Sequence, residues 1–175
     1  DMISVSNKYH GTSWAVGNVL VKRSLSFLER LAKFFGAKVE ETEYGIVYSS
    51  RKVVKNGFVN PTPQHFYGVD VWGGIADEVK EFIPKGITLY GECVGYLASG
   101  AGIQSTGGRV FDYGCEVGKH RLLIYRITHT NPDGKVMEYS WQQIADFCDK
   151  YGLEMPKTFY YGQAKMMFPE LDPAN

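Results

Sequence analysis

No apolar run in this 175-residue sequence approaches the roughly 18 residues needed to cross a bilayer. The chain also lacks an opening charged segment followed by an apolar signal core. These absences argue against a transmembrane helix and a secretory signal. We therefore expect a cytoplasmic protein with no membrane partner.

Cysteine is scarce, because only Cys93, Cys115 and Cys148 occur and no two of them form a C-x-x-C pair. Their odd number and wide spacing indicate neither a disulfide framework nor a zinc knuckle. We expect all three to be reduced thiols.

Net charge is also absent, because 19 lysines and arginines balance 19 aspartates and glutamates. No whole-chain field attracts nucleic acid, so a contact with a polyanion must come from a local patch. The hydrophobic content of 44% is enough for a sizeable core, and the length predicts a single domain over residues 1–175.

Hydrophobic patterning and turn signals predict an α+β domain with an antiparallel sheet. Helices are inserted between hairpin-like strands without regular strand–helix alternation. Two helices are expected to begin with capping boxes, Ser26 with Glu29 and Ser140 with Gln143, and a third is expected over about 69–83. The strands are expected at 12–21, 44–54, 87–97, 120–130, 135–139 and 158–161, and the glycine-rich stretch 98–119 is expected to be a long, mobile loop.

Lys8 stands in Lys-Tyr-His-Gly, where it is either an exposed lysine at a strand end or a nucleophile. A lysine attacks only when it is neutral, so a nucleophilic Lys8 must lie partly desolvated or beside other cations that lower its pKa, and a tight turn containing Gly11 would let a phosphate approach it. Glu92 lies inside an apolar strand, where a lone carboxylate is costly without a partner. That partner could be an arginine, solvent at a strand end, a ribose hydroxyl or a metal ion.

Two further positions have both an ordinary and a functional interpretation. Arg51, followed by Lys52 and Lys55, forms a basic cluster that is either a solvated edge or a phosphate contact. Tyr125 lies among leucines and isoleucines, where it is either a core residue or a platform for base stacking.

In chain order, Lys8, Arg51, Glu92 and Tyr125 and the residues around them resemble the motifs of the covalent nucleotidyltransferase superfamily of ATP-dependent polynucleotide ligases, and most closely those of the phage-type RNA ligases. Four segments carry the resemblance: Lys8-Tyr-His-Gly-Thr-Ser to motif I, Ser50-Arg51-Lys52 to the arginine motif, Tyr90-Gly-Glu92-Cys-Val-Gly to motif III, and Leu123-Ile-Tyr125-Arg-Ile to motif IIIa.

The resemblance implies an antiparallel α+β adenylyltransferase fold that uses ATP and Mg²⁺ or Mn²⁺. It implies a lysyl-AMP intermediate, with AMP then passed to a 5′-phosphate of RNA, or alternatively DNA, before strand sealing. The cytoplasmic setting then includes that of a phage-infected host, and the role includes RNA repair. By position, Lys8 is the nucleophile, His10 and Gly11 shape its turn, Glu92 contacts the ribose, Tyr125 stacks on adenine and Arg51 contacts the nucleotide.

The sequence departs from the family because the metal-binding motif IV and the lysine-rich motif V are not found. We therefore expect the domain to be incomplete at its C-terminus, and this chain to show weak or no complete ligation. The alternatives are a DNA ligase, an mRNA capping guanylyltransferase, or a catalytically silent nucleic-acid-binding domain.

Overall fold

The computed structural model describes residues 1–50, 54–55 and 70–171. These fall into two compact units, each assembled from separate stretches of the chain. The first comprises Asp1–Ser13, Tyr90–Ile127 and Tyr139–Asn175, and the second comprises Trp14–Leu89 and Thr128–Glu138. The single-domain assignment stays a prediction.

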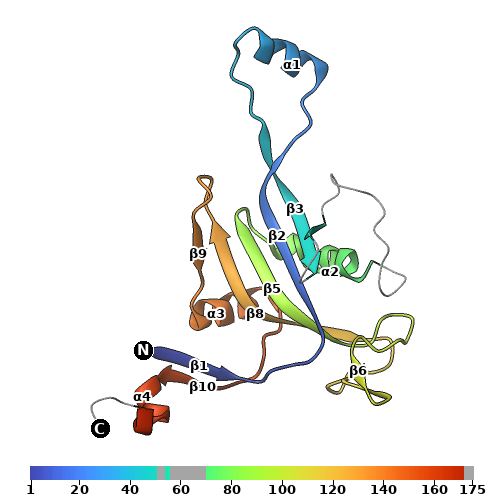
Figure 1. Ribbon diagram of the computed structural model, residues 1–175, viewed down its shortest axis with the longest axis vertical. Coiled ribbons are helices and arrows are strands. Elements are labelled where there is room, and N and C mark those ends of the chain that lie inside the picture. The colour runs from blue at the N-terminus through green and yellow to red at the C-terminus, as the bar shows by residue number, and fades with distance from the viewer. Residues whose placement is uncertain (51–53, 56–69, 172–175) are drawn as a thin grey trace. The chain divides into compact units, whose positions relative to one another are not determined.

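Five longer strands and one strand of two residues form the principal sheet (Figure 1). Their order is β4-β3-β2-β5-β8-β9, and the β2/β3, β3/β4 and β8/β9 pairs are antiparallel. The predicted α+β class with an antiparallel sheet is confirmed. The strands are β2 (Thr12–Lys22), β3 (Thr42–Ser50), β4 (Val54–Lys55), β5 (Ile87–Gly95), β8 (His120–Thr130) and β9 (Val136–Glu138).

Side-chain burial alternates in β5 from Ile87 to Cys93, although Val94 and Gly95 at its end are both buried, and this alternation decides where Glu92 lies. Ile87, Leu89 and Cys93 are buried, whereas Tyr90 and Glu92 are half-buried. Successive side chains of a strand point to opposite faces, so one face of β5 enters the core while the other carries Glu92.

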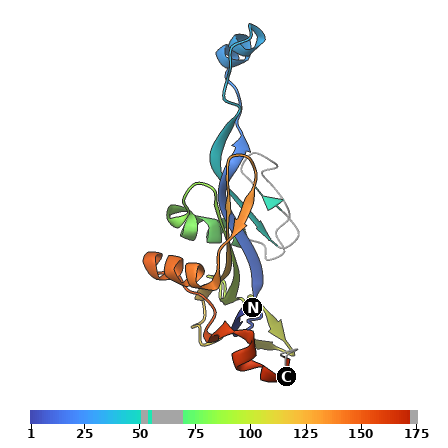
Figure 2. The ribbon, with the colours of Figure 1, turned by 90° about the vertical axis from the view of Figure 1, so that its left-hand side faces the viewer.

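In the second unit, helix α2 (Val71–Val79) lies beside β3, as Figure 2 shows. The Asp70 carboxylate begins this helix by accepting the Gly73 amide at 3.1 Å, and it also accepts the Tyr48 hydroxyl of β3 at 2.9 Å. The 3₁₀ turn Lys80–Phe82 continues the helix. The core of this unit contains Trp14, Val16, Val71, Ile75, Ala76, Val79, Ile83, Ile87 and Leu89.

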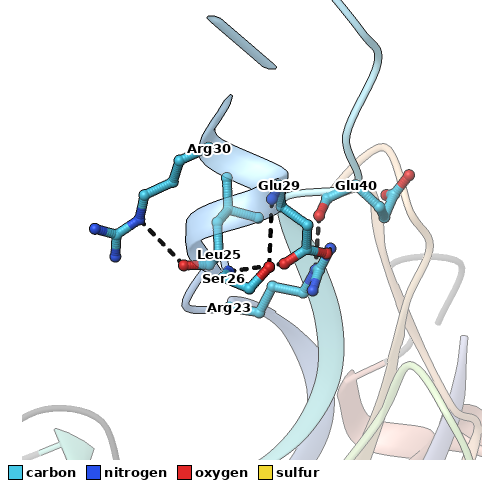
Figure 3. Close-up of polar contacts among 6 residues, drawn as sticks. All are labelled: Arg23, Leu25, Ser26, Glu29, Arg30 and Glu40. Carbon is cyan, nitrogen blue, oxygen red and sulfur yellow. Dashed lines mark hydrogen bonds and ion pairs between the residues drawn. The ribbon is translucent and has the colours of Figure 1, made fainter. Parts of the chain in front are cut away.

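Helix α1 (Phe27–Phe34) forms at the far end of the ribbon made by β2 and β3 (Figure 1). The predicted capping box is present, because Ser26 accepts the Glu29 amide and Glu29 accepts the Ser26 amide (Figure 3). Arg23 donates to Glu29 at 2.5 Å and to the Glu40 carbonyl, which ties the helix to the following segment. The Arg23 hydrogen bond, aided by Ser26, lowers the pKa of Glu29 to about 2.

The apolar residues of α1 do not reach a core, although their helical spacing indicates an amphipathic helix. Phe27 and Phe34 are 78% and 81% exposed, and Leu28, Leu31 and Phe35 are also exposed. The sequence therefore predicts the helix correctly but not its surroundings.

In the first unit, β1 (Met2–Ser6) pairs antiparallel with β10 (Thr158–Gln163), a strand pair of which only the second member is expected from the sequence. Helix α3 (Trp141–Tyr151) follows its predicted capping box, and Gly152 ends it with a φ of 64°. Helix α4 (Ala164–Met167) and the 3₁₀ turn Pro169–Leu171 follow β10. The core contains Cys93, Val94, Leu97, Ile103, Leu123, Ile124, Ile127, Ile144 and Cys148.

Most of the glycine-rich stretch 98–119 is the long loop that its composition predicts. It contains a small hairpin of β6 (Ser105–Thr106) and β7 (Arg109–Val110), closed by Gly107 and Gly108 with φ of 54° and 76°. Both values are positive, as a two-residue type I′ turn requires. The hairpin was not expected from the sequence, and the expected mobility of the loop stays a prediction.

The exposure of α1 gives a stability test within the second unit. Phe34→Ala should change the free energy of unfolding by no more than about 0.5 kcal/mol, because little apolar contact is lost. Leu89→Ala, at a site with 0% exposure, should cost about 2–5 kcal/mol. Urea denaturation checks both, and a loss of more than about 1 kcal/mol in Phe34→Ala would contradict the exposed position.

Candidate functional site

The Asn7–Gly11 turn joins β1 to β2 in the first unit and carries Lys8 with an exposed side chain. Its backbone is held at three points. Asn7 donates its amide to the Lys157 carbonyl at 3.0 Å, His10 to the Tyr113 hydroxyl at 2.8 Å, and Gly11 to Glu92 Oε1 at 2.9 Å. The turn is therefore fixed on both sides of Lys8 while the Lys8 side chain remains open to solvent.

Glu92 uses both carboxylate oxygens on the segment that follows Lys8. While Oε1 accepts the Gly11 amide, Oε2 accepts the Ser13 hydroxyl at 2.9 Å. Hydrogen bonds to an ionised carboxylate are stronger than those between neutral groups. The two groups are thus the partners that a carboxylate in this apolar strand needs, and an additional ribose contact stays a prediction.

Gly11 lies against the backbone of β5 so closely that no side chain fits. A Cβ atom at this position would lie 2.0 Å from the carbonyl oxygen of Cys93 and 2.8 Å from Val94 Cγ1. The glycine of Lys-Tyr-His-Gly is therefore required by packing as well as by the turn.

Tyr125 lies on β8, the neighbour of β5 in the sheet, and is 40% exposed. The flanking Leu123, Ile124 and Ile127 are buried. Interpreting Tyr125 as a core residue is therefore wrong. The next residue, Arg126, lies over Tyr90 on the face of β5 that carries Glu92, so alternation along β8 places Tyr125 on the opposite face of the sheet. The alternative, that its ring stacks on a base, stays a prediction.

A cation–π pair adds charge to the half-buried face of β5. The Arg126 guanidinium lies over the Tyr90 ring, 4.5 Å from its centroid. Tyr90 lies two residues before Glu92 and therefore on the same face of the strand. An aromatic ring paired with a guanidinium is suited to contacts with nucleotides.

Two expected components are not placed. Arg51 lies outside the described residues, so its contact with the nucleotide stays a prediction. Among residues 1–50, 54–55 and 70–171, no cluster of three or more histidines, cysteines, aspartates and glutamates could hold a metal ion. The use of Mg²⁺ or Mn²⁺ stays a prediction.

Cys115 is a half-buried thiol in the same unit, with its sulfur 3.9 Å from the Val94 carbonyl oxygen. Burial raises its pKa above the usual value for a thiol. Burial therefore disfavours the thiolate, the form in which a thiol attacks.

An open hollow of about 520 Å³ in the second unit is a rival location. It is lined by residues of β3 and α2, including Tyr48, Asp70 and Gly73. The Asp70 carboxylate caps α2 and binds the Tyr48 hydroxyl, so its chemistry is explained by the fold. The hollow contains no residue of the predicted motifs.

The sequence interpretation misses Tyr113 and the role of Ser13. Ser13 is the last residue of the segment Lys8-Tyr-His-Gly-Thr-Ser that resembles motif I, and this position could have identified it as a site residue. For Tyr113, the only local signal is the turn-forming Asp112-Tyr-Gly sequence within the glycine-rich stretch.

No helix among the described residues is long and apolar enough to span a membrane.

The close approach at Gly11 predicts a substitution effect of its own. Gly11→Ala should destabilise the chain by about 1–3 kcal/mol, because the new methyl group forces the Lys8 turn away from β5. Gly74→Ala is the control, since a Cβ there meets no atom within 4 Å and alanine favours a helix by about 1 kcal/mol. Thermal or urea unfolding measures both, and equal stability of Gly11→Ala and the unsubstituted chain would refute the packing argument.

The sequence matches no known protein-family model and no curated protein.

Proposed function

We propose that this chain is the adenylyltransferase part of an ATP-dependent RNA ligase in which Lys8 forms the lysyl-AMP intermediate. The observation that carries the proposal is the pair of hydrogen bonds from Gly11 and Ser13 to Glu92. Gly11 and Glu92 are 81 residues apart, yet they join the motif I-like turn to the motif III-like strand. Two segments that resemble one family in sequence therefore meet in space.

Lys8 is exposed shortly after the end of β1, as the alternative of an ordinary surface lysine also predicts, so its exposure does not favour the proposal. The hydrogen bonds of the His10 and Gly11 amides do support it, because they restrain the backbone beside Lys8 and such preorganisation lowers the cost of aligning an attacking group. In the proposed reaction, neutral Nζ attacks the α-phosphorus of ATP and a P–N bond forms. The bond from the α-phosphorus to the bridging oxygen breaks, pyrophosphate leaves, and the attacking nitrogen loses a proton to water, which reaches the exposed Lys8.

In the second step, an oxygen of a nucleic-acid 5′-phosphate attacks the same phosphorus. The P–N bond breaks, Lys8 regains its amine, and the 5′ end carries AMP through a new pyrophosphate linkage. Cationic side chains stabilise the negative charge that builds on phosphoryl oxygens in such displacements. Arg126 is a cation on the face of β5 that carries Glu92.

The covalent step is tested by incubating the chain with α-labelled ATP and Mg²⁺. We expect one AMP adduct, mapped to Lys8 by peptide mass spectrometry and absent in Lys8→Met. Lys38→Met, which removes another exposed lysine, should label like the unsubstituted chain. An adduct on a different lysine would overturn the assignment, as would one that survives in Lys8→Met.

The choice of nucleotide separates the proposal from two of its alternatives, the capping guanylyltransferase and the silent binding domain. Label from ATP but not from GTP is expected, whereas label from GTP alone would identify a capping guanylyltransferase. A chain that folds and binds nucleic acid but takes no label from either nucleotide would be a silent binding domain.

Tyr125 and Glu92 allow a second test, in which equilibrium binding of ATP is measured for the Tyr125 variants and Lys8 labelling is measured for the Glu92 variant. Tyr125→Ala should weaken binding by about 1–3 kcal/mol and Tyr125→Phe should have almost no effect, because stacking needs the ring and not the hydroxyl. Glu92→Gln should impair adenylylation without unfolding the chain. If Tyr125→Ala lowers the melting temperature but leaves the affinity unchanged, Tyr125 is structural.

A further inference from the structure

The turn Asp112–Cys115 presents Tyr113 in a conformation that is unusual for a residue with a side chain. Tyr113 has φ of 49° and Gly114 has φ of 82°, and the Cys115 amide donates to the Asp112 carbonyl at 2.9 Å. Asp112 Oδ1 also accepts the Gly114 amide at 3.0 Å. Positive φ disfavours tyrosine, so the turn holds Tyr113 against its backbone preference.

Tyr113 contacts the two residues that follow Lys8, Tyr9 and His10. Its hydroxyl accepts the His10 amide at 2.8 Å. Its ring meets the Tyr9 ring nearly edge-on, with centroids 4.8 Å apart. The residue immediately after Lys8 is therefore packed against Tyr113, and the next one is hydrogen-bonded to it.

Phe111 extends this contact. Its ring lies 5.4 Å from the His10 ring and stacks near Tyr113, with centroids 6.4 Å apart and planes at 22°. The Phe111 amide donates to the Gln104 carbonyl at 2.9 Å, which connects the aromatic pair to the β6/β7 hairpin. The glycine-rich stretch thus places two aromatic rings against the turn that carries Lys8.

We infer that Tyr113 is a positioning residue for Lys8, an inference that rests on the proposed function. The Tyr113 hydroxyl fixes the amide two residues after Lys8, and its ring restrains Tyr9, so together they limit the directions from which Nζ can approach a phosphorus atom. Attack requires alignment as well as proximity, and small misplacements of a reacting group lower rates steeply. The glycine-rich stretch therefore acts on the reaction through the backbone of the Lys8 turn.

Tyr113→Phe is the sharpest test, because it keeps the ring contacts and removes only the hydroxyl acceptor. We expect the rate of Lys8 adenylylation at saturating ATP to fall on the order of tenfold, with little change in the KM for ATP. Tyr113→Leu, which also loses the ring, should fall further. Tyr160→Phe is the matched control in the same unit, because its hydroxyl donates to the Gln163 carbonyl at 2.8 Å, and its rate should not change.

The outcomes separate this inference from the function on which it rests. If the unsubstituted chain labels on Lys8 and Tyr113→Phe labels at the same rate, the positioning role is wrong and the proposed function stands. A raised KM at an unchanged maximal rate would make Tyr113 a nucleotide-binding group and would also overturn the inference. No label in the unsubstituted chain would overturn both, whereas a slower rate with an unchanged melting temperature supports the positioning role.

Discussion

The hydrogen bonds that Glu92 accepts from Gly11 and Ser13 are the interaction on which the geometry around Lys8 depends. Glu92 belongs to a strand whose other face is in the core, so its position cannot adjust without moving buried side chains. A carboxylate in such a strand is costly unless donors satisfy it, and a backbone amide and a hydroxyl do so here. The same bonds that stabilise the carboxylate therefore also fix the start of β2.

The Lys8 turn combines a restrained backbone with an exposed side chain. Hydrogen bonds hold the amides of Asn7, His10 and Gly11, and the glycine lies in contact with the β5 backbone. A restrained backbone reduces the conformations that a reacting group must lose before attack, which is the general advantage of preorganisation. The arrangement is consistent with the chemistry proposed for Lys8, and it uses contacts from β5, from the segment before β10 and from the glycine-rich stretch.

Local sequence signals predicted most elements because each depends on neighbours in the chain. The capping boxes at Ser26 and Ser140 satisfy amides within one helical turn, and the helices begin where these residues predict. The β6/β7 hairpin was missed because it is formed by two-residue strands, too short for a periodic pattern. The apolar spacing of α1 identified a helix, but its exposure depends on which elements lie opposite, and spacing carries no information on that.

The sequence by itself determined the types of most elements, the antiparallel α+β class, and Lys8, Glu92 and Tyr125 as the positions of interest. These follow from propensity, periodicity and the order of short motifs. Only the tertiary structure decided that Glu92 binds Gly11 and Ser13, that Tyr125 is exposed, and that Tyr113 contacts the Lys8 turn. The physical reason is sequence separation. His10 and Tyr113 lie 103 residues apart, and local conformational preferences do not determine which distant group will accept a hydrogen bond from a backbone amide.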